Sequence, residues 1–156
     1  METKKFVACF LMLIWIGQPA LVASVTGKEV MYVGGTIKGL PEATEGSVNT
    51  NDEAKFIFNS DKGGFEIPYK SITSLEYGQK AGRRVGVAIV ISVWALFSKK
   101  RKHFLTIGFN DDSGKPQGVV LEIAKGRAKS MIIILESRSG KKVEYESEEA
   151  RAHVHG

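Results

Sequence analysis

One long apolar stretch limits what this chain can fold into. Thirteen consecutive residues, Val85–Phe97, carry no charge, and basic residues stand at both ends, Arg83–Arg84 and Lys99–Lys102. As a helix, this stretch would rise only ~20 Å, which is well short of the ~30 Å hydrocarbon core of a bilayer. A membrane-spanning segment normally has its positive charge biased to one side, and this one does not. The pattern therefore favours an apolar insertion at residues 83–98, helical or extended, within a folded domain.

The same stretch leaves three interpretations open. Large residues alternate with Gly86, Ala88 and Ser92 in the period of a buried strand, whereas Gly82 and Gly86 are spaced for close helix packing. It can be core packed inside the protein or on a partner, a shallow membrane insertion, or a true crossing. The residues predicted to contact a membrane interior or a partner are Val90, Trp94 and Phe97. The residues predicted to contact an anion or a lipid headgroup are Arg83, Arg84, Lys99, Lys100, Arg101 and Lys102.

The first residues have the three-part pattern of a secretory signal peptide. Lys4 and Lys5 precede an apolar run, Phe6–Ile16, and small residues follow a Gly-Gln-Pro break. Residues 1–24 are predicted to be this signal, with cleavage after Ala23 or Ser24; an uncleaved anchor is the alternative. The single cysteine, Cys9, lies within the signal, so no disulfide is expected in the exported chain. The predicted location is periplasmic or secreted, and peripheral on a membrane.

The remainder, residues 25–146, reads as one β-rich domain, with residues 147–156 as a polar tail that frays. Short apolar runs separated by turn residues predict six or seven antiparallel strands. The clearest are Ala54–Phe58 and a hairpin whose strands lie on either side of Asn110–Gly118. Residues 39–46 are predicted to be a turn, and Lys141–Tyr145 a short extended segment.

One helix is expected near the C-terminus. Met131, Ile132 and Leu135 have helical spacing, and Gly140 suits a left-handed cap, although the isoleucines also allow a strand at residues 129–139. Short strands followed by one helix predict a mainly β fold, a small antiparallel barrel or a sandwich, and in a barrel the helix would close the open end.

The segment Phe65–Tyr77, with the sequence FEIPYKSITSLEY, resembles bacterial domains of the pleckstrin-homology-like superfamily, of the GRAM-like kind. The resemblance covers about residues 28–145. It implies a bent seven-stranded barrel capped by a helix. It also implies a binding or adaptor module, sometimes for lipid headgroups, rather than an enzyme.

Signatures of catalysis are missing from the sequence. It contains no nucleophile elbow, no H-E-x-x-H and no glycine-rich phosphate loop with its lysine, so no enzyme, catalytic residue or cofactor is predicted. Asp111–Asp112 is predicted to be a hairpin tip and His103 a surface residue at the start of a strand. His153 and His155 are too few ligands for a metal site, and none is predicted.

Together these features predict a non-enzymatic exported module that binds a membrane surface peripherally through its apolar stretch and basic ends. The alternative is a soluble periplasmic protein whose apolar stretch packs on a protein partner or a second copy. Nucleic acid is not an expected partner, because aromatic residues are not interleaved with the basic ones. The sequence does not indicate an oligomeric state.

Overall fold

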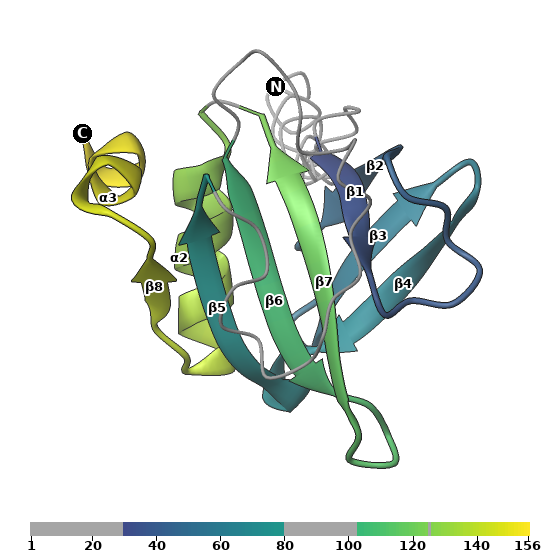
Figure 1. The fold of residues 1–156 in the computed structure, drawn as a ribbon. Helices are drawn as coiled ribbons and strands as arrows, with labels where there is room; N and C mark the ends of the chain where they lie inside the picture. The colour runs from purple at the N-terminus through teal and green to yellow at the C-terminus, as the bar shows by residue number, and fades with distance from the viewer. Residues whose placement is uncertain (1–29, 80–102, 125) are drawn as a thin grey trace, which may run out of the picture.

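The computed structural model describes residues 30–79, 103–124 and 126–156, which form one bent sheet and two α-helices (Figure 1). The strands are β1 (Val30–Gly35), β2 (Thr44–Asn49), β3 (Lys55–Ser60), β4 (Gly63–Pro68), β5 (Ile72–Gly78), β6 (Phe104–Asn110), β7 (Pro116–Ile123) and β8 (Val143–Tyr145). The helices are η1 (Tyr69–Ser71), α2 (Ala128–Ser139) and α3 (Glu148–His155). The strand order is β4-β3-β2-β1-β7-β6-β5-β8.

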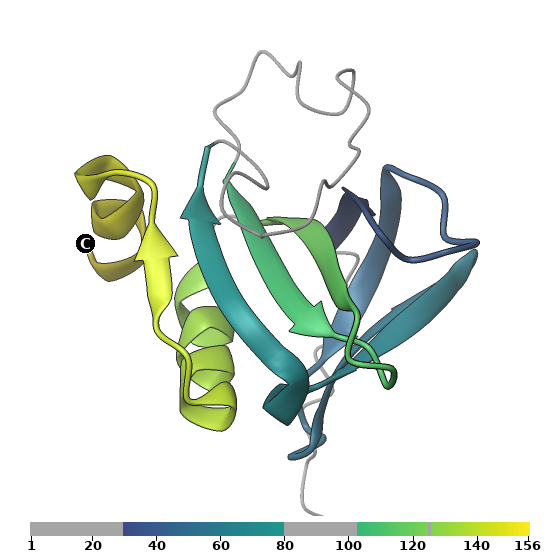
Figure 2. The ribbon, with the colours of Figure 1, turned by 60° about the horizontal axis from the view of Figure 1, so that its bottom comes forward.

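The mainly β class predicted from the sequence is confirmed, and the barrel is not. The eight strands form one sheet that is not closed, and β4 and β8 are its two edges within the described residues. The strands β2–β4 turn away from β5–β7, so that the sheet curves around its contents (Figures 1 and 2). The register of β1 against β7 shifts between Tyr32 and Gly34, as at a β-bulge.

Turn and proline chemistry explain the limits of the strands. The turn before Gly63 closes the hairpin of β3 and β4, and Pro68 ends β4 at the sheet edge, where a missing N–H is tolerated. The predicted hairpin of β6 and β7 is confirmed. The turn predicted over residues 39–46 is too long, because β2 already begins at Thr44 and pairs with β1 there.

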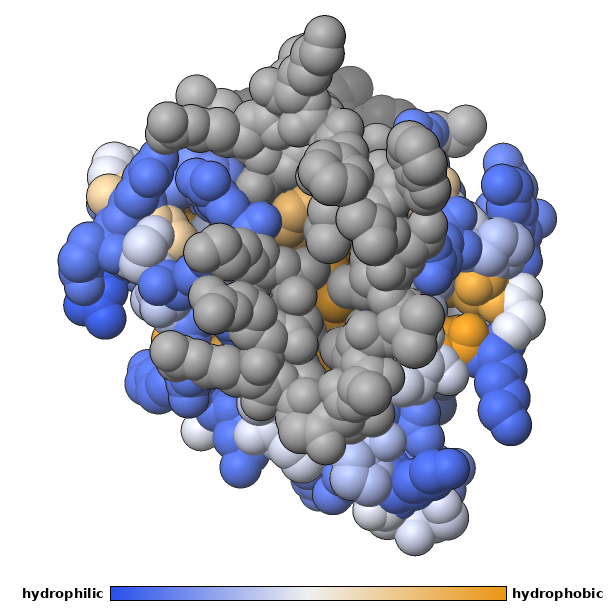
Figure 3. Space-filling view, viewed as in Figure 1, coloured by the Kyte–Doolittle hydropathy of each residue, from blue (hydrophilic) through white to orange (hydrophobic). Residues whose placement is uncertain are grey.

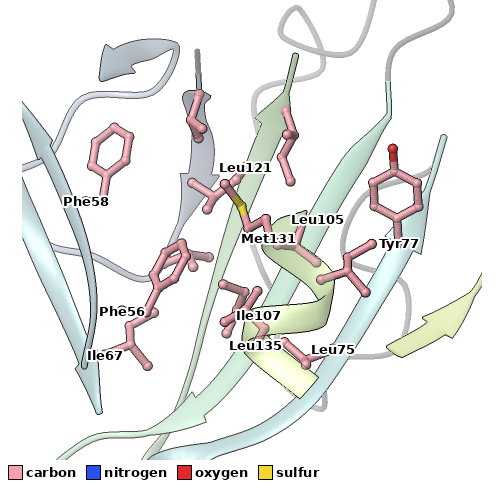
Figure 4. Packing of buried hydrophobic residues seen from close by; sticks show 14 of the residues in the cluster. Phe56, Phe58, Ile67, Leu75, Tyr77, Leu105, Ile107, Leu121, Met131 and Leu135 are labelled. Atoms are coloured by element: carbon pink, nitrogen blue, oxygen red, sulfur yellow. The ribbon is translucent and has the colours of Figure 1, made fainter. Parts of the chain in front are cut away.

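The main core lies on the inner side of the bend, against α2. Met131, Ile132 and Leu135 of α2 are buried, and Figure 4 shows Met131 and Leu135 pointing among Leu105 and Ile107 of β6. The helix predicted over residues 129–139 is confirmed, and Gly140 ends it in a left-handed conformation with φ of 71°. Apolar contact between helix and sheet therefore fixes how the sheet curves.

Arg138 attaches the last turn of α2 to the far part of the sheet. Its guanidinium donates hydrogen bonds to the carbonyl oxygens of Thr50 and Asp52 and, at 3.1 Å, to the Tyr69 hydroxyl. The same group lies 5.3 Å from the centre of the Tyr69 ring. A single side chain thus connects α2, η1 and the turn between β2 and β3.

The C-terminal residues correct the sequence expectation most clearly. The predicted fraying tail is wrong, because residues from Glu148 form α3, with Ala150 and Val154 buried. Ser147 caps the helix by accepting a hydrogen bond from the Ala150 amide, 3.1 Å away. The extended segment before α3 is confirmed as β8, but it pairs parallel to β5 and not antiparallel.

Candidate functional site

All nine residues predicted to contact a membrane, an anion or a partner lie outside the described residues. They are Arg83, Arg84, Val90, Trp94, Phe97, Lys99, Lys100, Arg101 and Lys102. The structure does describe the residues on either side, Gln79 and His103. Gly78 of β5 pairs with Phe104 of β6, so both ends of this stretch join neighbouring strands at one end of the sheet.

The N-terminal residues join the described fold at the same end. Val30, where β1 begins, pairs with Ile123, where β7 ends. The Ile123 amide donates a hydrogen bond of 3.4 Å to the His103 carbonyl. Neighbouring strands lie ~4.8 Å apart, so the connections to residues 1–29 and 80–102 all leave the sheet within ~15 Å of one another. We call this end, defined by Val30, Gly78, His103 and Ile123, the joining end.

A stack of aromatic rings lies at the joining end. The rings of His103 and His153 are parallel within 7° and 3.8 Å apart, and that of Tyr77 is stacked at 5.6 Å from His103. The Tyr77 hydroxyl and His153 Nδ1 share a hydrogen bond of 2.9 Å. These three residues come from β5, the start of β6 and α3. The stack therefore holds α3 against the strands that border residues 80–102.

The backbone at Gly78 and Gln79 makes a second contact, with Glu146, which lies just before α3. The Gln79 amide donates a hydrogen bond of 2.7 Å to a carboxylate oxygen of Glu146. A side chain at Gly78 would meet Glu146 atoms at 2.4 Å, so only glycine permits this approach. Figures 1 and 2 show α3 beside the end of β5 in both views. The C-terminal helix is thus an integral part of the joining end.

His103 directly precedes β6, as predicted, and is half-buried there. Its Nε2 is buried, and no described group forms a hydrogen bond with it. Burial, and then the neighbouring His153, lower the pKa of His103 below its ordinary value of 6.5, while Glu149 and Glu146 partly offset this. Burial also raises the pKa of Tyr77 to about 12, so its hydroxyl stays protonated. His103 and Tyr77 are therefore both neutral at pH 7.

We expect stability to fall as His103 gains a proton. Because the pKa of His103 is lower in the folded state, its contribution to stability is complete above pH 6.5 and is lost as the pH falls from there through the folded-state pKa. His103→Phe keeps the ring stack and removes this titration. Thermal unfolding followed by circular dichroism should show a smaller loss of Tm between about pH 7 and pH 5 in this variant. An unchanged loss would contradict the assignment to His103.

The two C-terminal histidines have separate partners. The Tyr145 hydroxyl and His155 Nε2 share a hydrogen bond of 2.9 Å, whereas His153 belongs to the stack. Within the described residues, no group of three His, Cys, Asp or Glu side chains is placed to hold a metal ion. The two histidines of the H-x-H motif thus lie on different sides of α3 and do not face a common metal site.

The outer face of the sheet, turned away from α2, carries a second apolar cluster. Val33, Phe104 and Val120 are 0%, 3% and 0% exposed, and Met31 packs against them. They form a group separate from the main core, in which Leu105 and its neighbours face inward. In Figure 1, α2 lies behind β5–β7, and no described helix or strand lies in front of them. Figure 3, from the same side, shows small areas of hydrophobic residues near the centre of the view.

Glutamates surround the outer cluster, because residues directly opposite one another in the register share a face. They are Glu45, Glu76, Glu122 and Glu144. Glu122 lies opposite both Met31 and Phe104. Glu76 lies opposite Thr106 and is only 5% exposed. The outer face, defined by these glutamates and by the cluster of Met31, Val33, Phe104 and Val120, is thus apolar in the middle and acidic around it.

Sequence reasoning missed both the stack and the outer face. Strand alternation in β6 and β7 carries the signal for the outer face, since Phe104 and Val120 are apolar at positions where a sheet with one solvated face has polar residues. The stack had no such signal, because His103 and His153 are far apart in the chain.

No protein-family model matches the chain, and no curated protein matches it significantly. In the described part of the chain, no helix is both long and apolar enough to cross a membrane. The fold, the joining end and the outer face are therefore the features of the chain that bear on its function.

Proposed function

We propose that this protein is a non-enzymatic binding module, exported and peripheral on an anionic membrane surface, with a pleckstrin-homology-like fold. Its joining end faces the membrane. The stretch Val85–Phe97 inserts shallowly, and the basic residues on both sides of it contact lipid headgroups. The observation that carries the proposal is the convergence of both ends of this stretch with the N-terminal connection at one end of the sheet.

The order of elements supports the family part of the proposal. Seven strands, β1–β7, are followed by a helix, α2, that packs on the inner side of a bent sheet. This is the order that the resemblance of Phe65–Tyr77 implies. β8 and α3 are additions to that order, and they pack at the joining end.

The distribution of basic residues along the chain supports an orientation in which the joining end faces the membrane. Seven of its 22 Lys and Arg residues lie between Lys80 and Lys102. Each basic residue near an anionic membrane surface contributes about 1 kcal/mol of attraction, and this attraction acts only within a Debye length. Both ends of this basic segment connect to the sheet at the joining end. At the opposite end, the turn between β6 and β7 holds Asp111 and Asp112.

Vesicle flotation tests the proposal. The protein is expressed from its whole reading frame, and mass spectrometry determines its N-terminus. We expect it to float with vesicles of anionic phospholipid at low salt and to stay in the soluble fraction with neutral vesicles. High salt should release it, because exposed charges are screened. A protein that stays soluble with anionic vesicles at low salt would refute the proposal. A stable dimer under those conditions would favour the alternative of self-association.

A further inference from the structure

The outer face has a composition that matches one segment of the same chain. Its middle is apolar and buried, with Val33 and Val120 at 0% exposure. Its surrounding residues include Glu76 and Glu122. Residues 80–102 have the same arrangement with charge of the opposite sign, an apolar middle between two basic ends. We propose that the outer face is the docking surface for the chain's own stretch Val85–Phe97, with its basic ends beside the surrounding glutamates.

Connectivity favours this segment over other partners. Residues 80–102 begin after β5 and end before β6, two adjacent strands of the sheet that carries the outer face. Phe104, which belongs to the outer cluster, is separated from residue 102 only by His103. A tethered segment has a high effective concentration at a neighbouring surface, whereas a separate partner must also lose its translational freedom.

The dimensions are compatible with docking. The four strands β1, β7, β6 and β5 span about 15 Å across at the usual strand spacing. A stretch of thirteen residues would be ~20 Å long as a helix, and a helix with its side chains is ~10 Å wide. The apolar middle of the stretch can thus lie over the outer cluster while each basic end reaches the glutamates around it.

Docking has a consequence beyond the proposed function. A face this apolar would otherwise expose a contiguous hydrophobic patch to water, and so would the stretch itself. Packed together, each removes the other from water when no membrane is present. The docking concerns the protein away from a membrane, so it stands or falls separately from membrane binding.

Photo-crosslinking tests the docking directly. Trp94 is replaced by p-benzoylphenylalanine in the full chain, and irradiated protein is digested and analysed by mass spectrometry. We expect crosslinks within one chain to peptides of β1, β6 and β7 that contain the outer cluster. The control carries the same probe at Ile133, which is 51% exposed on α2, on the other side of the sheet. Its yield to these peptides should be about tenfold lower, because it is held away from the outer face.

A second variant ties the crosslink to the outer cluster. Val120→Ser removes apolar surface from the middle of the outer face and should lower the Trp94-probe yield at least about threefold. Ile133→Ser, an exposed change on α2, should leave the yield unchanged. Crosslinks mainly to inward-facing peptides, mainly between two chains in an isotope-mixed sample, or equally strong from both probes would overturn the docking.

The same samples separate the two proposals. If anionic vesicles float the protein and reduce the crosslink, both docking and membrane binding hold. If the crosslink forms but the protein does not float, docking holds and the membrane proposal fails. If the protein floats but the probe never reaches the outer cluster, the docking inference is wrong.

Discussion

Replacing Arg83, Arg84, Lys99 and Lys100 together by glutamine should lower the affinity for anionic vesicles about a thousandfold at low salt. Each charge contributes about 1 kcal/mol near such a surface, so four contribute about 4 kcal/mol, and every 1.4 kcal/mol is a factor of ten. Flotation or sedimentation across a range of lipid concentrations measures the change. The effect should shrink at high salt, where the wild-type attraction is itself screened.

A variant with the same net charge is the control for this result. Four exposed lysines lie away from the joining end, after β1, in η1, in the turn between β6 and β7, and after α2. They are Lys38, Lys70, Lys115 and Lys141. Their replacement by glutamine should change the affinity far less, because these side chains would face away from the membrane. An equal loss in both variants would show that only net charge matters and would contradict the proposed orientation.

Ile132→Ala should destabilise the fold by about 2–5 kcal/mol, because it deletes buried methyl and methylene groups and leaves a cavity between α2 and the sheet. Ile132 is 1% exposed and belongs to the main core. The free energy of unfolding from urea denaturation measures the loss. The slope of that free energy against urea concentration should stay unchanged if the variant keeps the same fold.

The adjacent residue provides a matched control. Ile133 has the same side chain on the same helix but is 51% exposed. Ile133→Ala should change the free energy of unfolding by no more than about 0.5 kcal/mol, since the lost contact is small and alanine favours a helix. Similar losses for the two variants would mean that α2 does not pack on the sheet by the face containing Ile132.

Local patterns were enough to predict most of the described elements. Alternation in Leu105, Ile107 and Phe109 indicated which side of β6 faces the core, and all three are buried in it. Helical spacing around Met131, with a glycine at residue 140, predicted α2 and its end. These predictions succeeded because strand and helix periods, and the cap, depend on residues only a few positions apart.

Contacts between distant residues could not be predicted in this way. The polar residues after Tyr145 read as a tail because their partners are far away in sequence. His153 meets Tyr77 and His103 only when β5, β6 and α3 have assembled. The parallel pairing of β8 with β5 likewise depends on where the chain emerges from the end of α2.

Patterns of neighbouring residues were sufficient to predict a mainly β domain with a helix after its last hairpin and an apolar stretch between basic ends. Short-range periodicity and composition carry that information. The folded arrangement was needed to show that both ends of the stretch connect to one end of the sheet. It was also needed to show the outer face beside them, apolar in the middle and acidic around it. Strand order and register bring Met31, Phe104, Val120 and Glu76 together, and they are fixed by the packing of the whole core.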